Sequence, residues 1–233
     1  MMNPKDIPFA AGFAVSLYYM VRVFRTLPKP DWRNVLGLAL GIGLALATRA
    51  GGLLLIAYLG LFAGLDFLFK YGVKGLTTQT KLVGQYLVWC LGAALVGYII
   101  AVLFWPAALV DPIGHPLAAL TEFAQLGVKI RLLFEGENVM SDDTAWSYPL
   151  VWIVKTIPLY VLAGFLGSLF LLPRLLRKYD KTAVLLAYFA TVFPVAYILY
   201  KDSILHDGWR HLMFIYPSMI AVAALFWISM EDL

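Results

Sequence analysis

The sequence predicts an all-α integral membrane protein with about seven transmembrane helices and an interfacial helix in a long outer loop. Hydrophobic residues make up 62% of its 233 residues and charged residues 14%, and the mean hydropathy is +0.81. Soluble domains have about 45–50% apolar and about 25% charged residues. Long apolar stretches recur along the chain, and backbone groups in lipid must be satisfied within helices. We therefore expect one transmembrane domain over residues 1–233, with the outer loop at 105–149.

Seven apolar stretches are the predicted helices, and the basic residues between them set their direction. The stretches cover residues 7–24, 34–48, 51–69, 83–104, 150–172, 182–200 and 212–229. Lys and Arg cluster after the first, third and fifth stretches, and cytoplasmic loops carry such an excess. The N-terminus is therefore expected outside and the C-terminal tail inside. The net charge of +4 reflects this bias and gives no reason to expect nucleic acid as a partner.

The second stretch is short, and the third follows it almost at once. Gly37, Gly41 and Gly43 give it a small-residue face for close helix packing. Arg49 follows this stretch, so it is expected at a tight helical hairpin near the outer membrane face. Two interpretations stay open. Arg49 extends to lipid headgroups, or it is a fixed cation for a phosphate within the bundle, because ionisable residues at membrane depth are usually functional.

The outer loop is expected to contain a helix over residues 117–134, lying on the membrane surface. Five apolar residues of this segment recur at helical spacing: Leu120, Phe123, Leu126, Ile130 and Leu133. Lys129 and Arg131 lie between them and belong to the polar face. Packing against the bundle as ordinary core is the alternative. A polar stretch then leads back to the membrane.

Polar residues near the outer ends of the helices are the candidates for chemistry. Lys155 lies inside the fifth stretch, and Pro158 frees a backbone carbonyl beside it. A lysine at that depth needs an anion, a carbonyl or a water-filled cavity. Asp207, Arg210 and His211 crowd the start of the last helix. They form either a polar cap with an Asp207–Arg210 pair or a cluster that orients a phosphate or sugar.

Two further candidates have ordinary structural explanations. Asp6 lies at the start of the first helix, where the helix dipole favours an anion. Tyr148 belongs to a group of aromatic residues, with Trp146 and Trp152, that suits the membrane interface. The single Cys90 excludes an internal disulfide and a cysteine-based metal site. The three histidines are scattered, and no phosphate-binding loop or hydrolase motif is present.

A set of short stretches in a fixed order carries a family resemblance. They are Asn3–Ala10, Ala47–Gly52, Trp105–Pro106, Asp111–Pro112, Phe134–Gly136, Trp146–Pro149, Lys155–Leu159, Asp207–His211 and Phe214–Pro217. Together they resemble the polyprenyl-phosphate-dependent membrane glycosyltransferases of the GT-C fold. The most similar group is the dolichyl-phosphate-mannose protein mannosyltransferase-like family, which includes the lipid A aminoarabinose transferases. The resemblance spans nearly the whole chain.

The resemblance implies transfer of a sugar from a polyprenyl-phosphate carrier to a protein, lipid or glycan acceptor. The reaction takes place at the outer face of the bacterial plasma membrane or in the ER lumen. Asp6 is the implied catalytic carboxylate. The implied lipid-phosphate ligands are Arg49, Arg210 and Lys155, and the implied substrate contacts are Tyr148, Asp207 and His211. Asp6, Arg49 and Arg210 are expected to converge on one outer cavity. The resemblance leaves a divalent metal open as a cofactor.

One departure from the family concerns its main catalytic carboxylate, which follows a first transmembrane helix that this chain lacks. The chain is therefore expected to be the C-terminal part of a GT-C-like module, inactive alone or completed by a missing N-terminal segment. Two alternatives belong to other classes. A transporter or flippase would show an inverted repeat, and the hairpin at Arg49 has no counterpart in the second half. In a non-enzymatic membrane subunit, Arg49 and Arg210 would affect only stability or assembly.

Overall fold

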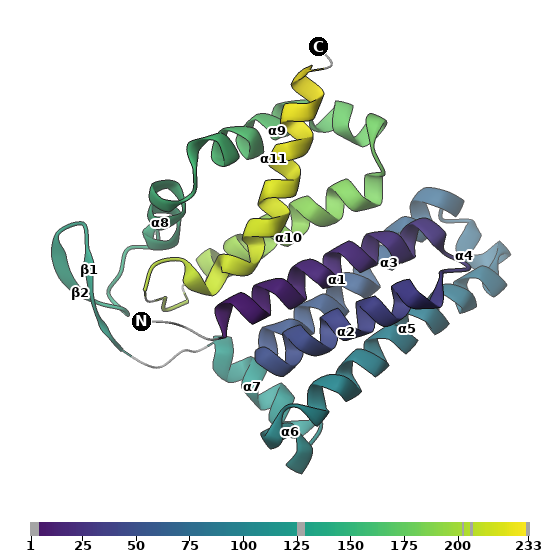
Figure 1. Ribbon diagram of the computed structural model, residues 1–233, viewed down its shortest axis with the longest axis horizontal. Helices are drawn as coiled ribbons and strands as arrows, with labels where there is room; N and C mark the ends of the chain where they lie inside the picture. Colours follow the sequence, from purple (N-terminus) through teal and green to yellow (C-terminus); the bar gives the residue numbers. More distant parts are fainter. Residues whose placement is uncertain (1–4, 125–128, 202, 206, 232–233) are drawn as a thin grey trace. The chain divides into compact units, whose positions relative to one another are not determined.

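The computed structural model describes residues 5–124, 129–201, 203–205 and 207–231, and it forms two compact units (Figure 1). The first unit is Met1–Ala119 and the second is Leu120–Leu233. Within the described residues, six helices are long and apolar enough to cross a membrane. The helix Trp32–Thr48 is apolar but shorter than these six. The predicted class of helical membrane protein is supported, although a two-stranded sheet adds a small β element.

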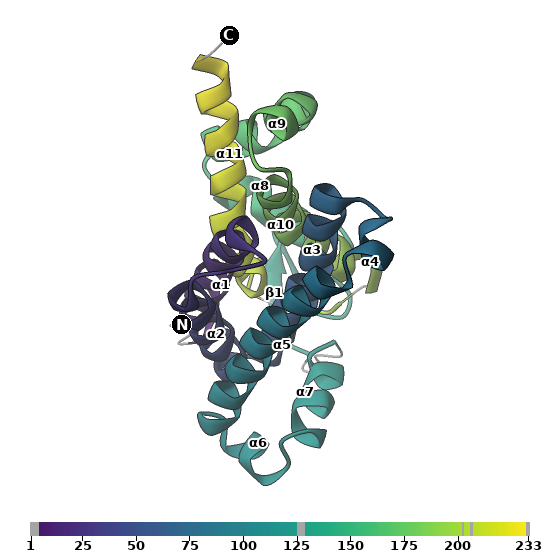
Figure 2. The ribbon, with the colours of Figure 1, turned by 90° about the vertical axis from the view of Figure 1, so that its right-hand side faces the viewer.

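The first unit is a helical bundle in which α1, α2, α3 and α5 pack on one another. Its elements are α1 Asp6–Thr26, α2 Trp32–Thr48, η1 Ala50–Gly52, α3 Leu53–Tyr71, α4 Gly75–Thr78, α5 Thr80–Leu103, α6 Pro106–Val110 and α7 Gly114–Ala124, the last of which extends past the unit boundary. Helices α1 and α2 lie side by side in both Figure 1 and Figure 2.

Glycines allow α2 to approach its neighbours closely, as the sequence predicts. A Cβ atom on Gly41 would lie 2.7 Å from Ser16 Oγ of α1, and one on Gly43 would lie 2.6 Å from the Ile100 side chain of α5. Gly12 of α1 is equally close to the backbone of Ala45, at 2.7 Å. Side chains at these positions would force the helices apart, so the small residues fix the α1–α2 spacing.

A buried carboxylate joins three helices at one end of the first unit. Asp66 of α3 accepts a hydrogen bond from the Tyr86 hydroxyl of α5, and the Lys70 ammonium lies 2.8 Å from the same oxygen. Lys70 also donates to the backbone carbonyl of Phe24 near the end of α1. The ends of α1 and α3 therefore lie together with the start of α5.

The second unit combines a β-hairpin with a bundle of helices. Its elements are β1 Arg131–Phe134, β2 Glu137–Met140, α8 Tyr148–Thr156, α9 Leu159–Lys178, α10 Lys181–Lys201, η2 Arg210–Ile215 and α11 Tyr216–Glu231. Figure 2 shows α11 beside α9. Gly164 of α9 lies against Ala223 and Trp227 of α11, so these two helices also approach closely.

The helix predicted over residues 117–134 is wrong in its second half. Helix α7 ends at Ala124, residues 125–128 lie outside the described part, and residues 131–134 form strand β1. The strand buries Leu132 and Phe134 and leaves Leu133 67% exposed, which is the period of a strand and not of a helix. Glu135 and Gly136 both have positive φ, so they form the tight turn that a two-residue hairpin requires.

The predicted continuous span over residues 150–172 is also wrong, because the chain breaks before Pro158. Ile157 is extended, with ψ of 133°, since a residue preceding proline is disfavoured in the helical region. Helix α8 therefore ends at Thr156, and α9 begins at Leu159. Lys155 consequently lies in the last turn of a short separate helix, and its side chain is exposed. The expectation that it is a lysine buried in a long span does not hold.

Candidate functional site

The residues selected from the sequence fall into two groups, one in each unit. In the first unit, the Arg49 guanidinium forms an ion pair with the Asp6 carboxylate. Both side chains are buried, with 10% of Arg49 and 4% of Asp6 exposed. Asp6 opens α1 and Arg49 caps the end of α2, so each charge also suits the helix dipole at its position.

The Asp6–Arg49 pair changes how the two residues can act. The family resemblance implies proton transfer for Asp6 and a lipid phosphate for Arg49, but each is already the partner of the other. A ligand anion at Arg49 would compete with Asp6 for the guanidinium. Leaving either group unpaired in this buried position would be costly, because a buried charge needs a compensating partner. The pair therefore holds the α1–α2 hairpin together.

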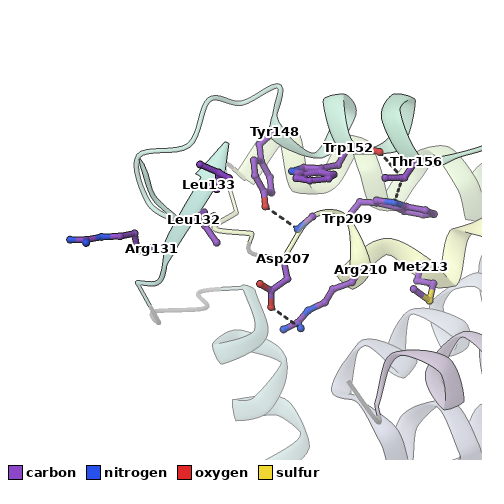
Figure 3. Close-up of a pocket in the computed structure, with 11 residues that line it drawn as sticks. Arg131, Leu132, Leu133, Tyr148, Trp152, Thr156, Asp207, Trp209, Arg210 and Met213 are labelled. Atoms are coloured by element: carbon purple, nitrogen blue, oxygen red, sulfur yellow. Dashed lines mark hydrogen bonds and ion pairs between the residues drawn. The ribbon is translucent and has the colours of Figure 1, made fainter. Parts of the chain in front are cut away.

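In the second unit, a cavity of about 440 Å³ brings together three of the sequence-selected residues, Tyr148, Asp207 and Arg210. Figure 3 shows this cavity between α8, the hairpin and the segment that leads into η2. Its other lining residues are Arg131, Leu132, Leu133, Trp152, Thr156, Gly208, Trp209 and Met213. In Figure 3 the Arg131 side chain extends away from the other labelled residues. The lining therefore combines three aromatic residues and three other apolar ones with the Asp207 carboxylate and the Arg210 guanidinium.

A tight turn at Asp207 and Gly208 shapes one side of the cavity. Both residues have positive φ, 56° and 73°, a conformation that costs energy for a residue with a side chain. The Gly208 N–H donates to the Tyr148 hydroxyl at 2.9 Å, which anchors the turn to α8. Asp207 in turn lies 2.7 Å from a terminal nitrogen of Arg210, so the predicted Asp207–Arg210 pair is present.

A second set of hydrogen bonds fixes the neighbouring tryptophan. The Trp209 indole N–H donates to the Thr156 hydroxyl at 2.6 Å, and this hydroxyl donates to the Trp152 carbonyl at 2.6 Å. The dashed lines in Figure 3 connect these three residues. Because the Thr156 hydroxyl is used as both donor and acceptor, the edge of the Trp209 ring is held in one orientation.

Two buried donors on the cavity wall have no hydrogen-bond partner among the residues that the structure describes. They are Arg210 Nε and Trp152 Nε1. Buried polar groups are usually satisfied by protein, water or ligand, so each unsatisfied group needs an explanation. The Trp152 ring meets the Tyr148 ring nearly edge-on, with centroids 6.3 Å apart. Neither atom is accessible to solvent, so these two donors do not show what the open cavity binds.

Two sequence-selected residues of the second unit do not line this cavity. Lys155 is exposed at the end of α8, and His211 is buried in η2. Trp152, Thr156 and Trp209 are among the lining residues that the sequence analysis did not select. The signal for two of them was visible, because Thr156 follows Lys155 directly and Trp209 stands between Asp207 and Arg210. Trp152 was explained as a residue of the membrane interface, and that explanation concealed its place in the site.

No family model matches the chain, and no significantly similar protein is found among curated proteins or solved structures. A guanidinium and aromatic walls in one cavity can bind a ligand that combines an anionic group with a ring or apolar face.

Proposed function

We propose that the chain is a membrane glycosyltransferase, or part of one, that binds a sugar linked to a polyprenyl phosphate. The observation that carries this proposal is the second-unit cavity, in which Arg210 lies among Tyr148, Trp152 and Trp209. The guanidinium suits the phosphate of the carrier, and the aromatic walls suit the sugar and the start of the lipid chain. The six long apolar helices suit an enzyme whose donor is dissolved in a membrane.

The proposed reaction is a single displacement at the sugar. An oxygen of the acceptor forms a bond to the anomeric carbon while the bond from that carbon to the phosphate oxygen breaks. The polyprenyl phosphate leaves with the bonding electron pair, and Arg210 stabilises the charge that develops on it. The proton of the acceptor passes to a carboxylate acting as general base. Asp207, a carboxylate on the cavity wall, is the candidate for this base.

Donor binding is the first test, with the full chain in lipid nanodiscs and tritiated undecaprenyl phosphate mannose as the probe. We expect Arg210→Gln to lower the affinity by about tenfold or more, since a charge-assisted contact contributes roughly 1.5–3 kcal/mol. Lys201→Gln is the matched control, because Lys201 is an exposed cation of the same unit outside the cavity. If the wild type and Arg210→Gln bind the lipid-linked mannose with equal affinity, the cavity is not the donor site.

Turnover is the second test and separates an enzyme from a binding subunit. Release of undecaprenyl phosphate is measured after acceptor-containing membrane extract is added to the loaded protein. We expect Asp207→Asn to abolish release while donor binding persists, and unchanged release would remove Asp207 from the proposed role of base. Binding without any release in the wild type would favour the non-enzymatic membrane subunit.

A further inference from the structure

Trp209 has an unusual combination of rigidity and access. Its indole N–H is held by Thr156, and its ring meets the Tyr216 ring nearly perpendicularly, with centroids 6.0 Å apart. The ring nevertheless lines the cavity and is only partly buried. The hydrogen bond from Trp209 joins residues 53 positions apart, from α8 and from the segment before η2. This hydrogen bond therefore fixes the orientation of an accessible aromatic ring.

A flat ring that is fixed beside a guanidinium suits one class of ligand. A pyranose has an apolar face of C–H groups, and these are attracted to the negative face of an aromatic ring. Arg210 is the next residue in the chain and lines the same cavity, where a terminal nitrogen of its guanidinium pairs with Asp207. The volume of about 440 Å³ lies within the usual range for small-molecule pockets, about 300–1,000 Å³.

We propose that Trp209 is the platform on which the sugar ring of the donor stacks, and that Thr156 is the positioning residue that holds it. This inference rests on the proposed function, because it places the phosphate of the same donor at Arg210. It adds a division of labour within the cavity. Arg210 binds the phosphate of the lipid with or without a sugar attached, whereas Trp209 contributes to the affinity only when a sugar is present.

The test compares two kinds of probe on the full chain in nanodiscs. One is undecaprenyl phosphate, and the other is the same lipid carrying mannose, glucose or galactose. The wild type should bind at least one of the sugar-bearing lipids more tightly than the bare lipid. Trp209→Leu should lower affinity for that sugar-bearing lipid on the order of tenfold, as expected for loss of one stacked ring, and leave the bare lipid within about twofold. Arg210→Gln should lower affinity for both.

Variants of Thr156 test its positioning role through the difference in affinity between the sugar-bearing and the bare lipid. A general loss of stability would not change this difference alone. Thr156→Val removes the anchor and keeps the size of the side chain, so it should reduce the sugar-dependent part of binding alone. Thr156→Ser keeps the hydroxyl and should restore it. Trp209→Phe provides a second variant where Trp209→Leu fails to fold. It keeps an aromatic face without the indole N–H. Its sugar-dependent binding should therefore fall between that of the wild type and that of Trp209→Leu.

Failures of the two proposals are distinguishable. If the wild type binds neither kind of lipid, the proposed function fails and this inference fails with it. If it binds the bare lipid and gains nothing from any of the three sugars, the platform is overturned while the phosphate site stands. A folded Trp209 variant that keeps the full sugar-dependent gain, or that loses both probes equally, also overturns it.

Discussion

At the scale of single residues, the Asp6–Arg49 pair joins the start of α1 to the end of α2 in the first unit. Little of either side chain is exposed, so removing one takes away the oppositely charged partner of the other. We expect Asp6→Asn or Arg49→Gln to lower the free energy of unfolding by about 3–5 kcal/mol. The double variant should recover part of this loss, because neither charge of the pair remains. Unfolding of the purified protein in detergent measures all three.

The same cycle tests whether the pair is a structural contact or a site held ready for a ligand. Strict additivity of the two single changes would mean that the side chains are not coupled. If Asp6 and Arg49 are coupled and Arg49→Gln binds the donor as tightly as the wild type, Arg49 serves only the α1–α2 contact. The sequence could place both residues at helix ends on one side of the membrane. It did not indicate that they bind each other, because 43 positions separate them.

At the scale of elements, the α1–α2 contact depends on the absence of side chains at particular glycines. Gly41→Ala would put a methyl group 2.9 Å from the Ser16 backbone nitrogen, so the helices must separate. We expect a loss of about 1–3 kcal/mol in unfolding free energy, as for overpacking elsewhere. Gly60→Ala is the matched control on α3, since nothing lies within 4 Å of its added Cβ. A similar loss in both variants would show that helix packing is not the cause.

The β-hairpin should respond to acid through one ion pair. The Lys129 ammonium, which hydrogen-bonds the Asp142 side chain, lowers the pKa of that carboxyl. A carboxyl with a lowered pKa in the folded state contributes stability above its unfolded value, about 3.9, and this is lost as the pH falls through the folded value. Amide exchange of the hairpin, corrected for intrinsic rates, should therefore accelerate below about pH 4. Asp142→Asn should show no such acceleration. If the wild type and Asp142→Asn have the same pH dependence of exchange, the Lys129–Asp142 pair does not stabilise the hairpin.

The sequence predicts most elements well because hydrophobic length is a robust signal in a membrane protein. The first stretch was expected over residues 7–24, and the helix is Asp6–Thr26. The failures have local causes. Leu133 lies at helical spacing from Ile130 and also belongs to strand β1, so the spacing alone does not reveal the hairpin. Pro158 interrupts the backbone without interrupting the apolar run, so α8 and α9 were taken for one helix.

At the scale of the whole molecule, two compact units each hold one group of the selected residues. The order of motifs along the chain could predict that Tyr148, Asp207 and Arg210 meet, because alternation places the starts of their helices on one side. It could not predict the role of Trp209, because its partner Thr156 lies at a helix end created by the Pro158 break. Tertiary hydrogen bonds of this kind have no counterpart in hydropathy.

The number of membrane crossings depends on α2, which has 17 residues and a length of about 26 Å. Its end at Arg49 meets the start of α1 at Asp6, while Lys70 at the end of α3 meets the carbonyl of Phe24 near the end of α1. Helix α2 therefore runs alongside α1 and returns the chain to the face where α1 began. A slightly short helix can still cross, because a bilayer thins locally at a modest cost. We predict that α2 spans the membrane.

Cysteine labelling tests this prediction in a Cys90→Ala background, with an impermeant maleimide on intact and permeabilised cells. Single cysteines replace Lys29, Lys74 and Glu137, which are all exposed. If α2 crosses, Lys29→Cys and Lys74→Cys react from the same face, and Glu137→Cys reacts from the other after α5. The positive-inside pattern predicts that Glu137→Cys is the one labelled in intact cells. Reaction of Lys29→Cys and Lys74→Cys from opposite faces would mean that α2 does not cross, and the first unit would then place its basic loops on both sides of the membrane.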